Sequence, residues 1–204
     1  MVNKFIVFEG IDGSGSSTQA QLLYNDLLYK KIPAKLTNEP TDGIIGHVIK
    51  NLFNGKFVFG GPQKEFDRMM AYLFAADRID HLFNKIDGIE KILQYKNVIS
   101  TRYFYSSLVY HSNNEDEIKF IYSLNKNFRK PDIIFYLDIS PEESIERIKY
   151  RDVKDSYENY EKLCLVYSNY KYILTKYMKD AIIIDGTLSI SEIHNIIMEK
   201  VCNE

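Results

Sequence analysis

Four residues near the N-terminus have the spacing of a phosphate-binding loop. Gly10, Gly15 and Ser17 match fixed positions of the pattern G-x-x-x-x-G-K-[ST], and Gly13 lies between them. In such a loop the small residues let successive backbone N–H groups turn inward, and the helix that follows adds partial positive charge. The lysine position of the pattern holds Ser16 instead. The spacing therefore predicts a phosphate-binding loop without its usual lysine.

The segments on either side of the loop support this prediction. The apolar run at residues 5–8 is typical of a buried strand, and a helical pattern with leucines on one face begins near Ser16. A strand, a glycine-rich loop and a helix in this order are the context that a phosphate-binding loop requires. The alternative is a tight connection that binds nothing, and the correctly placed Ser17 argues against it.

Two arginines could take part in a phosphate or nucleotide site. Phe74 and Arg78 lie four residues apart on one predicted helix, so an aromatic ring and a forked donor would project from the same side. The alternative is a core phenylalanine beside an arginine that extends to solvent.

Arg102 follows a predicted strand and could hold a phosphate through two hydrogen bonds. Its alternative role is an ion pair with Asp77 or Glu39.

A charged segment at residues 147–155 joins two predicted helices. Its basic residues are Arg147, Lys149, Arg151 and Lys154. Runs of charge are usually solvated faces. If this segment folds over a bound nucleotide, it is instead a lid whose arginines neutralise a transferring phosphoryl group.

Predicted strands and helices alternate along the chain. Strands are expected at residues 5–8, 34–37, 97–100, 132–139 and 181–185. Helices are expected at 16–31, 41–53 (with Thr41 as a cap), 63–84, 89–95, 106–128 with a polar break at 113–114, from 141, at 157–178 and at 190–201. This alternation predicts a parallel sheet with helices on both faces. The helix at 63–84 is apolar on more than one face, so a partner subunit could cover one of them.

Composition limits the classes of protein that fit. A chain of 204 residues with 45% hydrophobic and 26% charged residues indicates one globular domain with a real core. The net charge of −2 disfavours a general nucleic-acid-binding surface. The two cysteines and four histidines show no metal-ligand spacing. No signal-peptide pattern and no apolar run near 18 residues is present, which predicts a cytosolic protein without a membrane partner.

Five blocks of sequence, in the expected order, resemble the thymidylate kinase family. They read FEGIDGSGSSTQ at 8–19, TNEP at 37–40, LFAADR at 73–78, TRYFYSSLVYH at 101–111, and PDIIFYLD followed by PE within 131–142. The resemblance implies an α/β fold of the P-loop NTPase type, with three layers and a five-stranded parallel sheet flanked by helices. It also implies one nucleoside monophosphate kinase domain over residues 1–204, with a lid at about 147–156.

The resemblance implies an activity and its partners. Such an enzyme transfers the γ-phosphoryl group of ATP to dTMP, giving dTDP and ADP for dTTP synthesis. It needs Mg²⁺ and usually works as a homodimer.

The resemblance further implies roles for individual residues. The ATP-binding residues would be Gly10, Gly13, Ser14, Gly15, Ser16, Ser17 and Thr18, with Ser17 helping to hold Mg²⁺. The acceptor site would contain Asp12, Glu39, Pro40, Phe74, Arg78, Arg102, Ser107 and Tyr110. In it, Phe74 would stack on thymine, Arg78 would bond the edge of the base, and Arg102 would grip the phosphate. The catalytic residues would be Asp12, Arg102, Arg147 and Arg151.

Departures from the family pattern leave alternatives open. Ser16 replaces the loop lysine, Thr101 an aspartate, Asn38 an arginine and Ser156 a lid arginine. A lid residue, Arg151 or Lys154, or a bound cation is expected to supply the missing charge. The alternatives are a related kinase with a different acceptor and a nucleotide-binding protein without catalytic activity.

Overall fold

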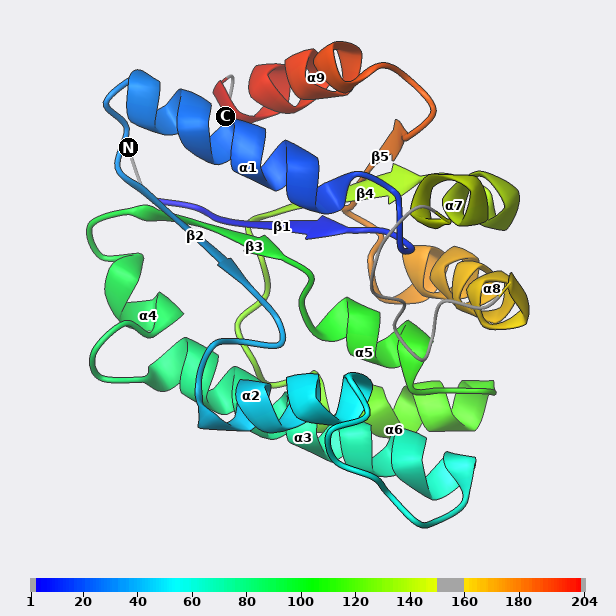
Figure 1. Cartoon of the computed structure of the whole chain (residues 1–204). Coiled ribbons are helices and arrows are strands. Elements are labelled where there is room, and N and C mark those ends of the chain that lie inside the picture. The colour runs from blue at the N-terminus through cyan, green and yellow to red at the C-terminus, as the bar shows by residue number, and fades with distance from the viewer. Residues whose placement is uncertain (1–2, 150–159, 203–204) are drawn as a thin grey trace.

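The computed structural model describes residues 3–149 and 160–202, and its centre is one parallel β-sheet (Figure 1). The strands are β1 (Phe5–Glu9), β2 (Ala34–Asn38), β3 (Asn97–Thr101), β4 (Ile133–Asp138) and β5 (Ile182–Asp185). They lie in the order β2-β3-β1-β4-β5, and all neighbouring strands are parallel. The predicted five-stranded parallel sheet is therefore confirmed, with β1 in the middle.

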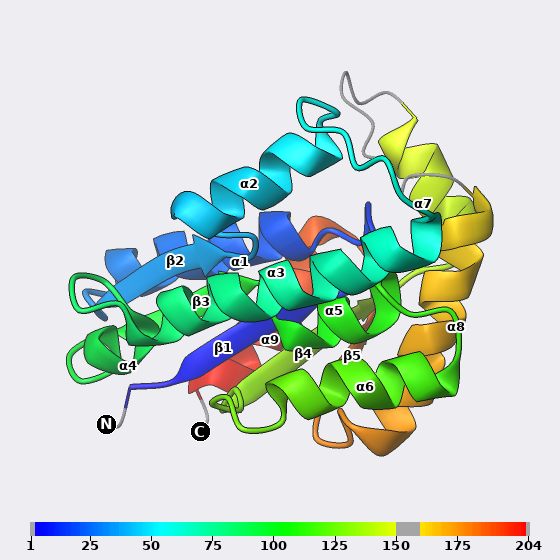
Figure 2. The same cartoon turned by 90° about the horizontal axis from the view of Figure 1, so that it is seen from below.

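Helices cover both faces of the sheet and complete three layers. They are α1 (Ser16–Tyr29), α2 (Ile44–Phe53), α3 (Gln63–Phe83), α4 (Ile89–Ile92), α5 (Phe104–Tyr110), α6 (Glu115–Asn125), α7 (Pro141–Ile148), α8 (Tyr160–Lys176) and α9 (Ile190–Cys202). In Figure 1, α1 and α9 lie above the sheet, whereas α2 to α6 lie below it. Figure 2 shows α3, α5 and α6 side by side on this lower face.

Alternation of side chains along the strands divides the core in two. On β1, Phe5 and Val7 belong to the cluster that also contains residues of α5 and α8, whereas Ile6 and Phe8 pack with Leu23 of α1 on the other face. Successive residues of a strand point to opposite faces, and both faces of this sheet are buried. This explains why the central strand β1 and its neighbour β4 are largely continuous apolar runs.

One predicted break and one predicted cap can be compared with the structure. The polar break predicted at 113–114 within the segment 106–128 is confirmed, because the Asn114 side chain accepts hydrogen bonds from the N–H groups of Asp116 and Glu117 and starts α6. The prediction that Thr41 caps a helix is wrong. The Thr41 hydroxyl donates to Asp77 Oδ1 at 2.6 Å and accepts from the N–H of Gly43 at 3.0 Å, so α2 begins three residues later.

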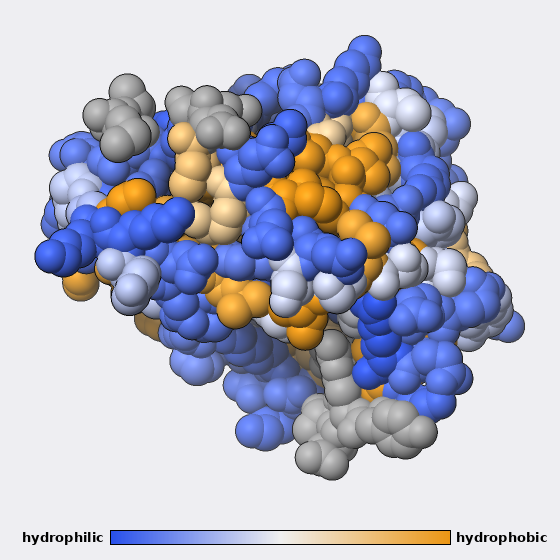
Figure 3. Space-filling model, turned by 90° about the horizontal axis from the view of Figure 1, so that it is seen from above, coloured by the Kyte–Doolittle hydropathy of each residue, from blue (hydrophilic) through white to orange (hydrophobic). Residues whose placement is uncertain are grey.

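Both helical layers expose some apolar side chains on their outer surfaces. Figure 3 looks onto the α1 and α9 face, which is largely hydrophilic with some hydrophobic patches. On α3, the side chains of Tyr72, Ile79 and Phe83 are about half exposed, at 47%, 52% and 57%. A partner subunit on this face of α3 stays a prediction. In the described part of the chain, no helix has the length and apolar character needed to span a membrane.

The division of the core predicts unequal effects on α1. Leu23 is fully buried against the sheet, whereas Leu28 on the same helix is 46% exposed. Leu23→Ala should lower the free energy of unfolding by about 2–5 kcal/mol, because it leaves a cavity, whereas Leu28→Ala should cost less than about 1 kcal/mol. Urea denaturation of both variants measures the difference. Equal effects would contradict this assignment of the core.

Candidate active site

The site lies where three neighbouring strands end. β2, β3 and β1 are adjacent and parallel, so the residues that follow them meet at one edge of the sheet. The N–H of Arg102 donates to the Phe8 carbonyl at 2.8 Å, and the N–H of Glu39 donates to the Thr101 carbonyl at 3.2 Å. The backbone therefore brings the glycine-rich loop, Glu39 and Arg102 together.

The glycine-rich loop has a backbone conformation that requires glycine. Gly10 has φ 155°, and a Cβ there would lie 2.8 Å from the Leu137 carbonyl oxygen. Gly15, with φ 94°, is the residue that precedes α1. Ser16 is only 9% exposed, whereas Ser17 and Thr18 are exposed in the first turn of α1. The loop thus presents a helix N-terminus but no cationic side chain of its own.

Helix α7 supplies a cation beside this loop. Arg147 donates from Nη1 to the Gly13 carbonyl at 3.4 Å and from Nη2 to the Gly186 carbonyl at 2.9 Å, and its Nε donates to Glu143 at 2.7 Å. Ser144 of the same helix donates to the Asp12 carbonyl at 2.5 Å. The guanidinium of Arg147 is therefore held against the loop from outside.

A cavity of about 300 Å³ opens next to the loop and contains most of the predicted acceptor residues. It is lined by Asp12, Glu39, Pro40, Phe74, Arg102, Ser107 and Tyr110, all expected from the sequence. Lys50, Phe53, Asn54, Tyr103, Ser106 and His111 line it as well. Lys50 is a cation that the sequence analysis missed, because a lysine on a predicted helix gives no signal of its direction.

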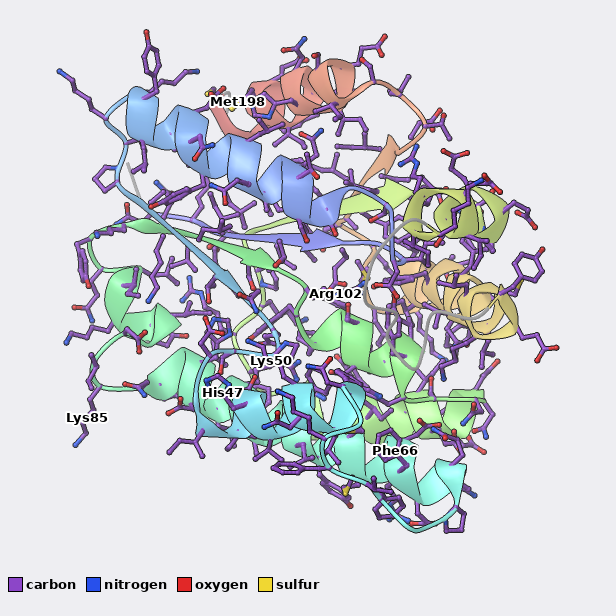
Figure 4. All side chains as sticks on the ribbon, in the orientation of Figure 1. His47, Lys50, Phe66, Lys85, Arg102 and Met198 are labelled. Carbon is purple, nitrogen blue, oxygen red and sulfur yellow. The ribbon has the colours of Figure 1, made fainter. Side chains whose placement is uncertain are left out.

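Figure 4 labels two cationic residues that line the cavity, Lys50 and Arg102. Lys50 extends from α2, and Arg102 directly follows β3. Lys50 Nζ lies 2.6 Å from Asp42. Lys50 and Arg102, from separate elements, therefore both line this cavity, with the Lys50 ammonium paired to Asp42.

Arg102 is held by several acceptors at once. Its Nη1 donates to the Gly10 carbonyl at 3.2 Å and to Ser106 at 3.0 Å, and its Nη2 donates to Asp12 at 2.5 Å and to the Tyr110 hydroxyl at 3.1 Å. The expected alternative partners, Asp77 and Glu39, are thus wrong, since Asp12 is the ion-pair partner. Arg102 also has φ 66°, a strained conformation of the kind that clusters at functional sites.

Arg78 is completely buried, which contradicts the alternative in which it extends to solvent. Its Nε donates to both carboxylate oxygens of Glu39, at 3.1 and 2.9 Å, and its other nitrogens donate to Asn125 and Ser107. Burial alone would raise the pKa of Glu39, but Arg78 and His81 more than offset this and hold the pKa below its ordinary value. In this structure Arg78 holds Glu39, which lines the cavity. A direct contact of Arg78 with a base stays a prediction.

Aromatic rings form the apolar part of the cavity. Phe74 lies 5.0 Å from the His111 ring and 6.1 Å from Phe53, measured between ring centroids. Burial, together with the charges of Lys162 and Arg78, lowers the pKa of His111 to about 3. The imidazole is therefore neutral at neutral pH.

The predicted lid can be placed only in part. Arg147 lies in the last turn of α7, whereas Arg151, Lys154 and Ser156 lie outside the described residues. The expectation that Arg151 or Lys154 supplies the missing charge therefore lies outside the described residues, whereas Arg147, expected as a catalytic arginine, lies beside the loop.

Known proteins resemble this chain along nearly its whole length. A family model described as thymidylate kinase matches residues 8–197. The chain belongs to the thymidylate kinase family. The predicted family, fold class and ATP-dependent nucleoside monophosphate kinase activity are thereby confirmed.

Similar proteins in archaea agree with this assignment. A probable thymidylate kinase of Methanococcus aeolicus is 40% identical over all of this chain and 98% of its own length. One of Methanocaldococcus jannaschii is 39% identical over 95% of this chain and 93% of its own length. One of Thermococcus onnurineus is 36% identical over 98% of both chains.

The neutral state of His111 predicts a pH dependence of stability. The unfolded chain binds a proton at His111 below about pH 6.5, whereas the folded protein resists it down to about pH 3, so stability falls as pH falls in this window. At pH 5 the loss should be about 2 kcal/mol relative to neutral pH. In His111→Gln, the free energy of unfolding should not show this decrease between neutral pH and pH 5, as measured by urea denaturation across pH.

An exposed histidine provides the matched control. His47 is exposed in the folded protein, so His47→Gln should retain the pH dependence of the wild type. If His111→Gln also retains it, His111 is not the group that titrates.

Proposed function

We propose that this chain is a thymidylate kinase that transfers the γ-phosphoryl group of ATP to dTMP, giving dTDP and ADP. One observation carries the proposal: Asp12, Phe74, Arg102 and Tyr110 line a single cavity that opens beside the glycine-rich loop. Phosphoryl transfer depends mainly on positioning and charge neutralisation, so two adjoining sites with these side chains are what the reaction requires.

The acceptor site divides into an apolar and a charged part. Phe74 offers a ring face for stacking on the thymine base, and His111 lies beside it. Arg102 and Lys50 would hold the phosphate, whose oxygens would take over some of the hydrogen bonds that Arg102 now donates to protein acceptors. Asp12 accepts a hydrogen bond from the Tyr110 hydroxyl at 3.0 Å, so both would face the sugar.

The donor site consists of the backbone and hydroxyls of the glycine-rich loop. Residues 10–18 would cradle the phosphates of ATP through N–H groups at the start of α1. The described residues contain no cluster of three metal-ligating side chains, and Mg²⁺ commonly keeps waters and substrate phosphates as ligands. The exposed Ser17 hydroxyl fits this pattern, and bound Mg²⁺ would neutralise phosphate charge.

Arg147 is our candidate for the charge that the loop lacks. It donates to the carbonyls of Gly13 and Gly186, whereas Arg102 donates to the carbonyl of Gly10. Arg151 remains a second candidate for a catalytic arginine.

We also propose a homodimer and a single kinase domain over residues 1–204, acting in the cytosol without nucleic-acid or membrane partners. The half-exposed apolar side chains of α3 support a subunit contact. One sheet shared by both halves of the core supports a single domain.

A panel of nucleoside monophosphates with ATP and Mg²⁺ tests the substrate. We expect dTMP to be converted at about 1–100 s⁻¹, the ordinary range for kinases. Ser16→Lys should then raise the rate less than tenfold, because another cation already serves the site. Turnover of a different monophosphate would contradict the choice of dTMP. Nucleotide binding without any turnover would support a non-catalytic protein.

Arg147 can be tested separately. Arg147→Met should lower kcat about 10³-fold or more, because a cation beside the transferring group contributes about 10³–10⁵ in rate. Arg147→Lys should lose less, and Arg68→Met, whose guanidinium lies over Phe120, should behave as wild type. If Arg147→Met keeps kcat within threefold, the charge comes from another residue, and Arg151→Met becomes the decisive variant.

A further inference from the structure

Glu9 is a buried acidic residue that none of the roles above explains. It ends β1, directly before the glycine-rich loop, and it is completely buried. Burial raises the pKa of its carboxyl, although hydrogen bonds from Ser106 and Tyr170 and the charge of Arg102 oppose this shift. Burying a carboxylate costs free energy unless hydrogen-bond donors satisfy it, so the donors that surround Glu9 must offset this cost.

Three donors from two helical regions converge on the Glu9 carboxylate. Oε1 accepts the backbone N–H of Tyr103 at 2.9 Å. Oε2 accepts the Ser106 hydroxyl at 2.6 Å and the Tyr170 hydroxyl at 2.8 Å. Tyr103 and Ser106 lie at the start of α5, directly after Arg102, and Tyr170 belongs to α8. Glu9 thus ties the end of the central strand to the segment that carries Arg102.

The Ser106 hydroxyl connects Glu9 with Arg102. Arg102 Nη1 donates to Ser106 Oγ at 3.0 Å. A guanidinium can only donate and a carboxylate can only accept, whereas a hydroxyl has one hydrogen and two lone pairs. The hydrogen of Ser106 therefore points to Glu9, and a lone pair is left facing Arg102. Only this direction satisfies both neighbours.

We propose that Glu9 is a positioning residue for Arg102, acting through the Ser106 hydroxyl to keep the guanidinium directed at the acceptor cavity. The inference rests on the proposed function, in which Arg102 binds the acceptor phosphate. Nη1 of Arg102 is fixed by Ser106 and the Gly10 carbonyl, and Nη2 by Asp12 and Tyr110. Glu9 itself does not line the cavity, so it contributes to acceptor binding without touching the acceptor.

Glu9→Gln is the decisive variant because it keeps the shape of the side chain and replaces one acceptor oxygen by an NH₂ group, which donates. The backbone N–H of Tyr103 can only donate, so the amide oxygen should stay with it and the amide NH₂ should face Ser106 and Tyr170. The Ser106 hydrogen must then turn away from residue 9, either toward the Tyr170 hydroxyl at 3.1 Å or toward Arg102, where it would compete with the Nη1 hydrogen bond. We expect the Kd and KM for dTMP to rise about tenfold, with the KM for ATP unchanged within twofold.

A charge-matched control and a double variant separate positioning from folding. Glu90 accepts from Arg129 at 3.3 Å and does not line the cavity, so Glu90→Gln should leave both substrates unaffected. If Glu9 acts through Ser106, Glu9→Gln should weaken dTMP binding much less in a Ser106→Ala background than in the wild type. Full additivity of the two substitutions would overturn the proposed route.

Calorimetric titration with dTMP in the absence of ATP, beside turnover assays, keeps this inference distinct from the proposed function. Unchanged dTMP affinity in Glu9→Gln, or an equal loss of dTMP and ATP affinity, would overturn the inference. A wild type that binds dTMP without phosphorylating it would contradict the kinase activity, and the effect of Glu9→Gln on dTMP affinity would still decide the role of Glu9. A wild type that binds no dTMP would overturn both.

Discussion

The hydrogen-bonded pairing of β1 with its two neighbours is the constraint on which the site depends. Phe8 is opposite Thr101 on β3 and Phe135 on β4, so the glycine-rich loop must leave the sheet beside Arg102. A shift of one residue in a strand would turn its side chains to the opposite face and expose the apolar run. The two buried cores therefore fix the register, and the register places the reactive side chains.

Charge in the site is paired rather than concentrated. Asp12 pairs with Arg102, and Glu39 pairs with Arg78 deep in the interior. Removing one member of a buried pair leaves an uncompensated charge, which costs more than the pair contributes. The chain also lacks both the loop lysine and the aspartate that the family pattern has at Ser16 and Thr101. Loss of one charge of each sign leaves this balance unchanged.

The cavity has an aromatic side and a cationic side, as a nucleotide-binding site requires. Phe74 and His111 form a neutral aromatic side, whereas Lys50 and Arg102 form a cationic side. Stacking requires an uncharged, desolvated surface, and phosphate binding requires donors that do not have to reorganise. Burial of His111 and the anchoring of Arg102 supply these two conditions.

Features that depend on local pattern follow from the amino-acid sequence alone. Apolar runs predicted the strands, glycine spacing predicted the loop, and five ordered blocks predicted the family and most of the cavity residues. The pairing of the charged side chains, in contrast, depends on how the elements pack in three dimensions. The tertiary structure paired Arg102 with Asp12 and Arg78 with Glu39, directed Lys50 into the cavity, and connected Glu9 to Arg102 through Ser106. The physical reason is that these contacts join residues from different elements, and strand order and helix packing, rather than local spacing, bring those elements together.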